Sequence, residues 1–426
     1  MKTAISTLAP ALAFLLLAAN LAQAQTVSTL QPTDHCRDFA STDVATFADA
    51  DLEEVVREAL GETAGQPLTC GKLAQLKQLI VGTEIQRVVY GGTLRPSPEK
   101  PFESLDGLQN LVNLETLNLI NRLITDIGPV GELSKLQNLN LHTNWFSDIS
   151  PLARLTGLRQ LIISENPIFD ISPLAGLTRL ERLHVHGLYP YQLQHYLNYN
   201  DGRDPNVVFN GITDVSPLAN LTELRLLRIH LNEISDISPL AGLTKMTHLR
   251  LYNNRIQDIS ALQHMDDLVL LWLHNNLVED ISPLAGKTSM LQLGLNDNRI
   301  RDIAPLASMT RLEHLFLSNN DIEDISALSG LSSLGVLRLE NNRVSNVRPL
   351  QALANLRELS LSHNDALYDV GPLLANEGIG RGDELDLSYT YTPCSAMEQL
   401  ESRGVKLLRV TALNGSSCAG RRLEDP

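Results

Sequence analysis

The chain is poor in several kinds of residue on which many protein classes depend. Aromatic residues make up only 4% of its 426 residues, and 34 Lys and Arg stand against 49 Asp and Glu, a net charge of −15. A protein that binds nucleic acid or anionic lipid needs a basic face. The acidic balance therefore argues against both partners. The hydrophobic fraction of 43% is that of a globular chain and excludes wholesale disorder.

Long apolar runs are also scarce, and the clearest one lies at the N-terminus. The stretch 8–19 is apolar and follows Lys2, the positive residue at the start of the chain. It is too short to span a membrane, and the small residues Ala22 and Ala24 suit cleavage by a signal peptidase. We expect residues 1–24 to be a signal peptide, so that the mature chain is exported and has no membrane insertion. An uncleaved anchor is the alternative.

What the chain has in abundance is leucine at a fixed spacing. One unit reads LEHLFLSNNDIEDISALSGLSS over residues 312–333, and its pattern LxxLxLxxNxI recurs every 22 residues. Alternating leucines of LxxLxL enter a core while the residues between them face outward, as a strand requires. The pattern is that of a leucine-rich repeat, whose units stack into a solenoid. The first position is apolar in Leu114, Leu136, Leu158, Leu180, Leu224, Met246, Leu268, Met290, Leu312, Leu334 and Leu356.

Two polar columns accompany the leucines. An Asn follows each strand where the chain turns away from the sheet, and we expect its amide to satisfy neighbouring backbone groups as a ladder. In the Asp-Ile-Ser-Pro-Leu spacer, Ser caps and Pro begins a short helical turn. Nine Asp residues share one position of the spacer, so we interpret them as scaffold and not as a metal-binding row. The short period predicts a shallow curve.

The spacer Asp-Ile-Ser-Pro-Leu-Ala-x-Leu-Thr on this period resembles the internalin class of bacterial leucine-rich repeat proteins, over about residues 34–410. A eukaryotic phosphatase-regulatory subunit shares the short repeat class. The resemblance implies a small helical cap before the repeats. The chain lacks the wall-anchoring motif and the C-terminal modules of the best-known internalins, so surface display and host-cell invasion do not carry over.

We therefore predict an α/β solenoid, a curved leucine-rich repeat array with a parallel concave sheet and short helical turns on its convex side. A helical N-terminal cap is expected over 25–82, repeats over 83–383, a C-terminal cap over 384–418 and a tail over 419–426. One cap helix has the apolar stripe Leu52, Val55, Val56 and Leu60, and ends at Gly61. A second is expected through Leu73, Leu76 and Leu79. Leu385 and Leu387 are expected in a last strand, closed by a helix around Met397–Leu400.

The cysteines lie near the two ends of the array. Four cysteines allow three pairings. If the middle is elongated, only Cys36–Cys70 and Cys394–Cys418 bring sulfur atoms within bonding distance. A zinc site is the alternative, although the sequence has no CxxC pair and export implies an oxidising setting. We predict two disulfides, one stapling each cap.

One stretch, 186–210, breaks the period. Between Leu180 and Leu224 lie 44 residues, twice the period, without the usual spacer. An arbitrary insertion seldom has the length of one period, so we favour a divergent repeat with its own strand. Pro205, at a core-strand position, favours an inserted loop instead. Four of the nine tyrosines fall here, either as a recognition bulge or as a packed helix.

The outward positions of the strands are unusual for so acidic a chain. Large aromatic and cationic residues concentrate between Arg228 and Phe316, and Arg and Trp are typical of interface hot spots. Gly294, between Trp272 and Phe316, is expected to leave a slot for an apolar side chain of a partner. The alternative is that the aromatic residues merely cover one another. The candidate partner-binding residues are Arg228, His230, His248, Arg250, Tyr252, Trp272, His274, Phe316 and Arg338.

Seven of the eleven histidines lie in the same columns: His142, His184, His186, His230, His248, His274 and His314. If the divergent repeat supplies a strand, those at 142, 186, 230 and 274 lie about 10 Å apart, too far to share a metal. If 187–209 is a loop, His186 and His230 become neighbours and a zinc or copper site is conceivable. We expect ordinary solvated histidines, no metal and no cofactor. A pH-dependent contact is a further alternative.

Catalysis finds little support, because the sequence has no phosphate loop, no HExxH, no GxSxG and no Cys left for nucleophilic work. We predict a non-enzymatic, secreted or periplasmic bacterial protein, a monomer, that binds a protein partner through a rigid concave face. The alternatives are a host-directed adhesin or virulence factor, a regulatory subunit of an enzyme in the same compartment, and an enzyme or metal carrier.

Overall fold

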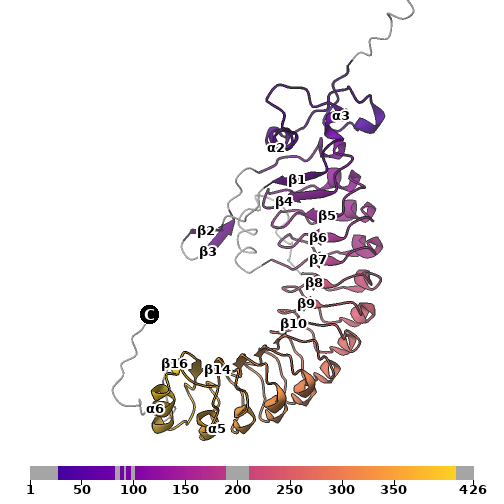
Figure 1. Ribbon diagram of the computed structural model, residues 1–426. Coiled ribbons are helices and arrows are strands. Elements are labelled where there is room, and N and C mark those ends of the chain that lie inside the picture. Colours follow the sequence, from indigo (N-terminus) through magenta and orange to yellow (C-terminus); the bar gives the residue numbers. More distant parts are fainter. Residues whose placement is uncertain (1–26, 82–86, 91–92, 97–100, 189–210, 409–426) are drawn as a thin grey trace, which may run out of the picture.

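The computed structural model describes residues 27–81, 87–90, 93–96, 101–188 and 211–408. Its repeats stack into an open arc that runs from the N-terminal cap at the top of Figure 1 to the C-terminal cap at the bottom. The strands line the inner side of the arc and short helical turns line the outer side. The predicted solenoid is confirmed. Among the described residues, no helix combines the length and apolar character that a membrane crossing requires.

The inner side is a parallel sheet, with fourteen strands in the described part of the chain. Equivalent residues of successive repeats are partners, as Leu117, Leu139 and Leu161 are, so each repeat position forms a row across the sheet. The strands, in sheet order, are β1 (Gln78–Val81), β4 (Thr116–Leu119), β5 (Asn138–Asn140), β6 (Gln160–Ile162), β7 (Arg182–His184), β8 (Leu226–Arg228), β9 (His248–Arg250), β10 (Leu270–Trp272), β11 (Gln292–Gly294), β12 (His314–Phe316), β13 (Val336–Arg338), β14 (Glu358–Ser360), β15 (Glu384–Asp386) and β16 (Lys406–Leu408). Separately, β2 (Arg87–Tyr90) and β3 (Thr93–Pro96) pair antiparallel.

The convex side consists of short 3-10 helices. The spacer Asp accepts a hydrogen bond from the first amide of each turn, as Asp280 Oδ1 does from Ser282 N at 2.8 Å, and Pro follows in most repeats. A fixed φ and a missing amide suit Pro to this place. The 3-10 helices are η1 (Cys36–Asp38), η2 (Leu108–Asn110), η3 (Gly128–Glu132), η4 (Ser150–Arg154), η5 (Ser172–Gly176), η6 (Ser216–Leu218), η7 (Ser238–Gly242), η8 (Ser260–Leu262), η9 (Ser282–Leu284), η10 (Ala304–Ser308), η11 (Ser326–Gly330) and η12 (Arg348–Leu350).

A continuous apolar core fills the space between the sheet and the turns, and the Asn column closes its edge. Leu and Met of the first repeat position are buried throughout. Asn276 accepts from Ile256 N at 3.0 Å and donates to Leu251 O and Leu273 O at 3.1 and 2.9 Å. One amide thus satisfies backbone groups of two neighbouring repeats, which confirms the predicted ladder.

The N-terminal cap contains one of the two predicted helices in full. α2 (Ala50–Leu60) begins after Asp49, whose side chain accepts from Leu52 N, and ends at Gly61 in the left-handed region at φ 70°. The second prediction is wrong beyond its first turn, because α3 (Cys70–Leu73) ends before Leu79. Leu79 lies in β1, where alternate residues are buried and pair with β4. The predicted Cys36–Cys70 disulfide is confirmed, with a Cα–Cα distance of 5.4 Å.

The C-terminal end contains α5 (Gly371–Leu374) and α6 (Cys394–Ser402), and α6 buries Met397 and Leu400 as predicted. β15 is not the last strand, because the chain returns after α6 to form β16 beside it. Cys418 lies outside the described residues, as do 1–24 and 419–426. The second disulfide, the signal peptide and the predicted domain boundaries therefore stay predictions.

The sheet passes directly from β7 to β8 where the period breaks. Arg182, Leu183 and His184 are the partners of residues 226–228, and Val185 N and Gly187 N donate to carbonyls of the second repeat at 2.9 and 3.0 Å. This ladder leaves no room for an intervening strand. The predicted divergent repeat with its own strand is therefore wrong. Residues 189–210, with Pro205 and the four tyrosines, lie outside the described residues.

Candidate functional site

Three rows of side chains cross the concave face, and the strand register fixes their order. The middle row is Ile80, Asn118, Asn140, Ile162, His184, Arg228, Arg250, Trp272, Gly294, Phe316, Arg338, Ser360, Asp386 and Leu408. The first row, two residues earlier in each repeat, includes Arg182, Leu226, His248, Leu270 and His314. The third row, two residues after the middle row, includes His142, Ser164, His186, His230, Tyr252 and His274.

A cation and an aromatic ring meet in the middle row. The guanidinium carbon of Arg250 lies 5.0 Å from the ring centroid of Trp272 on the next strand, within cation–π distance. The indole also lies against His274, with 5.6 Å between ring centroids. Its Nε1 is buried and has no hydrogen-bond partner among the described residues. The register therefore assembles Arg228, Arg250 and Trp272 on three successive strands.

The predicted slot at Gly294 is wrong. Gly294 is buried, and a Cβ at this position would lie 3.7 Å from Trp272 Cγ and 3.6 Å from His274 Nδ1. Both distances are ordinary van der Waals contacts, so the two rings pack beside the glycine and cover it. Because Gly294 is covered in this way, it leaves no open slot for a partner's side chain.

The arginines create a positive region on an acidic protein. Burial, followed by the charges of Arg228, His142 and Arg250, lowers the pKa of His184 to about 3. The pKa of His248 is lowered in the same direction, first by partial burial and then by Arg250 and Arg228. Both imidazoles are therefore neutral at neutral pH, and the positive charge of this region comes from the guanidinium groups.

Arg338 of the middle row forms ion pairs with Glu358 on β14 and with Glu340, the latter at 3.8 Å. Its charge is therefore balanced within the sheet. Phe316, on the preceding strand, lies against His314 with 6.4 Å between ring centroids.

The third row is a stack of rings. Successive centroids of His142, His186, His230, Tyr252 and His274 lie 6.0, 4.2, 4.0 and 4.2 Å apart. The expectation of solvated histidines about 10 Å apart is wrong, because direct pairing of β7 with β8 makes His186 and His230 neighbours. The small side chain of Ser164, two residues after β6, lets the rings of His142 and His186 approach each other.

Burial dominates the electrostatics of this stack. It lowers the pKa of His186 to about 3 and that of His230 to about 2, with neighbouring positive groups adding to the effect. His230 is only 2% exposed and its Nδ1 has no hydrogen-bond partner in the described part of the chain. His230 is therefore inaccessible to a partner, whereas Tyr252 and His274 are partly exposed.

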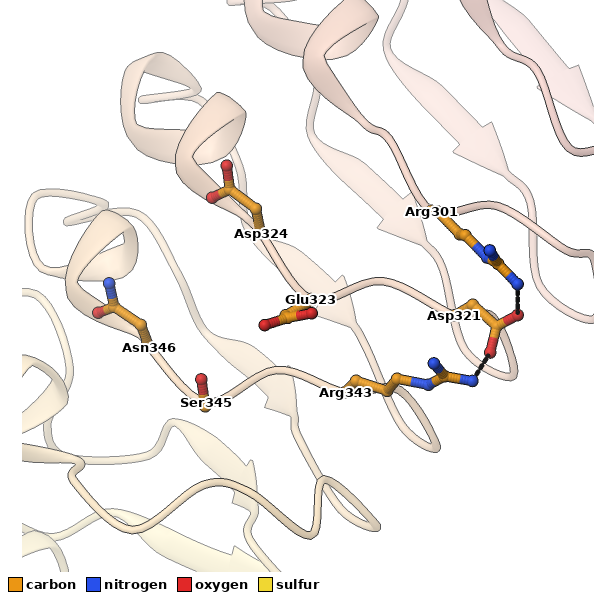
Figure 2. Close-up of a pocket in the computed structure, with 7 residues that line it drawn as sticks. All are labelled: Arg301, Asp321, Glu323, Asp324, Arg343, Ser345 and Asn346. Carbon is orange, nitrogen blue, oxygen red and sulfur yellow. Dashed lines mark hydrogen bonds and ion pairs between the residues drawn. The ribbon is translucent and has the colours of Figure 1, made fainter.

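A depression on the flank of the solenoid lies apart from this face (Figure 2). It is lined by Arg301, Asp321, Glu323, Asp324, Arg343, Ser345 and Asn346. Asp321 pairs with Arg343 at 2.6 Å and with Arg301 at 3.6 Å. The two arginines offset two of the three carboxylates of the wall, so the depression offers only a weak field for a charged ligand.

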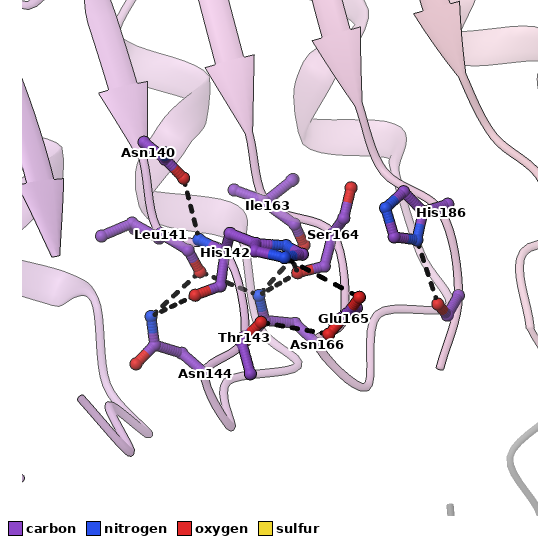
Figure 3. A network of polar contacts seen from close by, with 11 residues as sticks. Asn140, Leu141, His142, Thr143, Asn144, Ile163, Ser164, Glu165, Asn166 and His186 are labelled. Carbon is purple, nitrogen blue, oxygen red and sulfur yellow. Dashed lines mark hydrogen bonds and ion pairs between the residues drawn. The ribbon is translucent and has the colours of Figure 1, made fainter. Parts of the chain in front are cut away.

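One group of possible metal ligands lies at the start of the third row (Figure 3). His142, Glu165 and His186 each offer one ligand atom, and these atoms all lie within 4.8 Å of one another. His142 Nε2 lies 3.7 Å from Glu165 Oε1. Such nitrogen and carboxylate donors suit a transition metal.

The chain is similar to known leucine-rich repeat proteins in sequence and in fold. A family model described as leucine-rich repeats (two copies) matches residues 112–154, 244–286 and 288–330. The crystal structure of an internalin, InlF, from Listeria monocytogenes is 30% identical, with 86% of this chain and 95% of that chain covered and a TM-score of 0.70. The chain belongs to the internalin-like leucine-rich repeat proteins.

More distant structures share the fold of this internalin-like protein. A leucine-rich repeat protein of Leptospira interrogans is 19% identical, with 84% of this chain and 94% of that chain covered and a TM-score of 0.59. A chain of the LRIM1/APL1C complex is 17% identical, with 71% and 57% covered and a TM-score of 0.50. At these identities the likeness shows the fold alone. No curated protein matches the sequence.

Glu165 is a candidate ligand of this internalin-like protein that was not predicted from its sequence. Its φ is 57°, in the left-handed region, at the repeat position that Asn253 and Asn275 occupy with φ 54° and 53°. Asn tolerates this conformation better than most residues. A Glu in a column where Asn is common was the available signal.

Proposed function

We propose that this internalin-like protein is a non-enzymatic binding module that holds a protein partner against its concave face. The proposed contact centres on Arg228, Arg250 and Trp272 and extends to Tyr252 and Phe316. The observation that supports it is the cation–π pair of Arg250 and Trp272 on the sheet that lines the inner side of the arc (Figure 1). Arg and Trp at the centre of a rigid surface are typical of binding hot spots.

The chemistry of the face indicates an acidic partner with apolar side chains. Burial first, and then the charges of Arg228 and Arg250 among others, lower the pKa of His184. These guanidinium groups would attract carboxylates to an otherwise negative protein. Leu226 and Leu270 of the first row are partly exposed and flank His248. Because the strands are already ordered, binding costs little conformational entropy.

The composition of the proposed contact differs from the nine residues chosen from the sequence. His230 is left out because it is buried, and Arg338 contributes less because Glu340 and Glu358 balance its charge. Arg228, His248, Arg250, Tyr252, Trp272, His274 and Phe316 remain the proposed contact residues.

Export supports the same proposal from another direction. Residues 1–24 have the pattern of a signal peptide, and the Cys36–Cys70 disulfide suits an oxidising compartment. We place the mature protein, as a monomer, in the periplasm or outside the cell. A partner from the producing cell would indicate regulation in its own compartment, and a partner from a host would indicate an adhesin. The LRIM1/APL1C complex is an assembly in which a chain of similar fold takes part.

The test is a crosslinking capture with the wild type and a Trp272→Ala/Arg250→Ala variant. Extracts of the producing cells and surface proteins of a plausible host would be offered separately. Removing two hot-spot residues should weaken partner binding by about 2 kcal/mol or more, roughly 30-fold in Kd. Affinity for the identified partner should also fall as salt rises, because the arginines act through charge.

A matched control keeps the comparison fair. Phe169→Ala/Arg179→Ala also removes one aromatic ring and one guanidinium, but both residues are exposed outside the concave sheet. This control should bind as the wild type does. Leu273→Ala, one residue along from Trp272 and fully buried, should instead destabilise the fold by about 2–5 kcal/mol. A partner retained equally by the Trp272/Arg250 variant would exclude the concave face as its site.

A further inference from the structure

The third row brings together three side chains that the proposed binding function does not use. His142 lies two residues after β5, Glu165 three residues after β6 and His186 two residues after β7. One ligand atom from each lies within 4.8 Å of the other two, in a group drawn from three successive strands. The parallel register holds all three backbones in place, so a site here is built into the solenoid.

The hydrogen bonds fix which nitrogen of each histidine faces the group. His142 Nδ1 lies 3.0 Å from Ser164 O, and His186 Nδ1 lies 3.3 Å from Gly187 O. A carbonyl only accepts, so Nδ1 bears the proton and Nε2 of each neutral ring bears the lone pair. Figure 3 shows the His142 ring beside Glu165 and the other ring nitrogen of His186 directed to the same side. Imidazole ligands of metal sites are oriented by the same kind of bond.

The carboxylate is oriented as well. Thr143 Oγ1 donates to Glu165 Oε2 at 3.1 Å, while Oε1 is the oxygen that faces His142. The side chains of His142 and Glu165 are only 16% and 14% exposed, and His186 is at least partly buried. The group is therefore shielded from bulk water without being sealed from it.

A second observation comes from the next ring of the stack. His230 lies 4.2 Å from His186, centroid to centroid, and holds that ring in place. Its buried Nδ1 makes no hydrogen bond with the described residues. A buried polar atom of this kind is costly unless something pairs with it. A buried ring nitrogen without a described partner, His230 Nδ1, therefore lies in the residue stacked on one of the three side chains.

We propose that His142, Glu165 and His186 bind one divalent transition-metal ion, with Zn²⁺ the best fit. Two nitrogens and one carboxylate oxygen are a common zinc donor set, whereas Ca²⁺ and Mg²⁺ require oxygen ligands throughout. Three protein ligands leave a coordination position open to water or to a partner's side chain. The spacing of the histidine row predicts no metal, because His142 and His186 lie two repeats apart and the carboxylate between them, Glu165, is not in the histidine column.

The test uses the full chain without an affinity tag, stripped with a chelator and then titrated with Zn²⁺ by calorimetry. We expect about one equivalent per chain. Titration with Co²⁺ adds an independent readout, because its visible spectrum reports the number and type of ligands. Glu165→Gln and His142→Gln should each weaken Zn²⁺ binding at least about tenfold and alter the Co²⁺ spectrum. Ca²⁺ should not compete.

His274→Gln is the matched control, since it removes a histidine of the same row outside the group. It should bind Zn²⁺ as the wild type does. Circular dichroism and thermal melts establish that each variant is folded. Failure of the wild type to bind Zn²⁺ would overturn the proposal, and so would binding that survives in both Glu165→Gln and His142→Gln. Capture of a partner by the wild type and the Trp272/Arg250 variant is a separate measurement. The failure of the metal proposal can therefore be told apart from the failure of the proposed partner binding.

Discussion

Lys287 is a charged residue in a core position. Neighbouring repeats place Met265 and Met309 in the same column, and Lys287 is as fully buried as they are. Its Nζ donates to Gln263 O and Met265 O at 3.3 and 3.2 Å and lies 3.7 Å from an Asp266 carboxylate oxygen. Burial lowers the pKa of Lys287, and Asp266 offsets only part of this effect. The charged form is therefore less favourable in the folded state than in the unfolded state.

Replacing this lysine should stabilise the protein. Lys287→Met matches the adjacent repeats and removes a buried charge, so we expect a gain of about 1–3 kcal/mol at pH 7 by chemical denaturation. The sign of the pH effect follows from the lowered pKa. The unfolded chain holds its proton to a higher pH, so wild-type stability should rise as pH increases through the folded pKa toward 10.5. The variant should lack this rise.

Lys245→Met is the control for that series, because Lys245 is exposed and pairs with Glu223 at the surface. Its effect should stay within about 0.5 kcal/mol. A Lys287→Met protein less stable than the wild type at pH 7 would mean that the two carbonyl hydrogen bonds outweigh the cost of burying the ammonium group.

Within one repeat, the Asn column should contribute much more to the free energy of unfolding than the Asp column does. Asn276 is buried and serves backbone groups of two repeats, whereas Asp280 is exposed and accepts only from the amide and the hydroxyl of Ser282. Asn276→Ala leaves buried groups unpaired and should cost about 2–3 kcal/mol or more. Asp280→Ala removes one exposed cap and should cost about 1 kcal/mol. Chemical denaturation of the two variants side by side measures the difference. Equal losses of stability would contradict the prediction that the Asn ladder contributes more than the Asp caps.

The repeats could be predicted from the sequence because each position of the period has one physical role. Leucine spacing fixed the strands, and the Ser-Pro pair fixed the turns. The break between Leu180 and Leu224 could not be resolved in this way, since its length equals two periods and suits either a repeat or an insertion. The second cap helix failed for a related reason. Its apolar spacing suited a helix, but pairing with β4 made residues 78–81 a strand.

The candidate site was predictable in part. Because strand register follows from the period, the adjacency of Arg250 and Trp272 could be read from the sequence. The Trp272 ring over Gly294 could not, because a rotamer choice placed it there and not the period. The contact between His186 and His230 depended on β7 meeting β8, a long-range fact that no local pattern contains. The group of His142, Glu165 and His186 depended instead on side-chain rotamers, which the period does not set.

At the scale of the whole molecule, the solenoid depends on its ends. The core would be exposed at the first repeat if the N-terminal cap did not cover it. Cys36 N donates to the buried Asn110 Oδ1 at 2.6 Å, and Gln109 Nε2 donates to Pro32 O at 2.7 Å. The disulfide to Cys70 then holds this segment against β1 and the first repeats. Because each repeat contacts mainly its neighbours, loss of a cap should first destabilise the strands beside it.

A Cys36→Ser/Cys70→Ser variant tests this dependence. The bond spans a sequence separation of 34, so its loss should cost about 3–4 kcal/mol through the freedom gained by the unfolded chain. Hydrogen exchange should quicken first in β1 and β4, while β11, β12 and β13 keep their protection. A Cys394→Ser/Cys418→Ser variant, which keeps the Cys36–Cys70 bond, is the control and should keep the protection of β1 and β4. Uniform loss of protection along the sheet would mean that the array unfolds as one cooperative unit, in which case the cap stabilises every repeat equally.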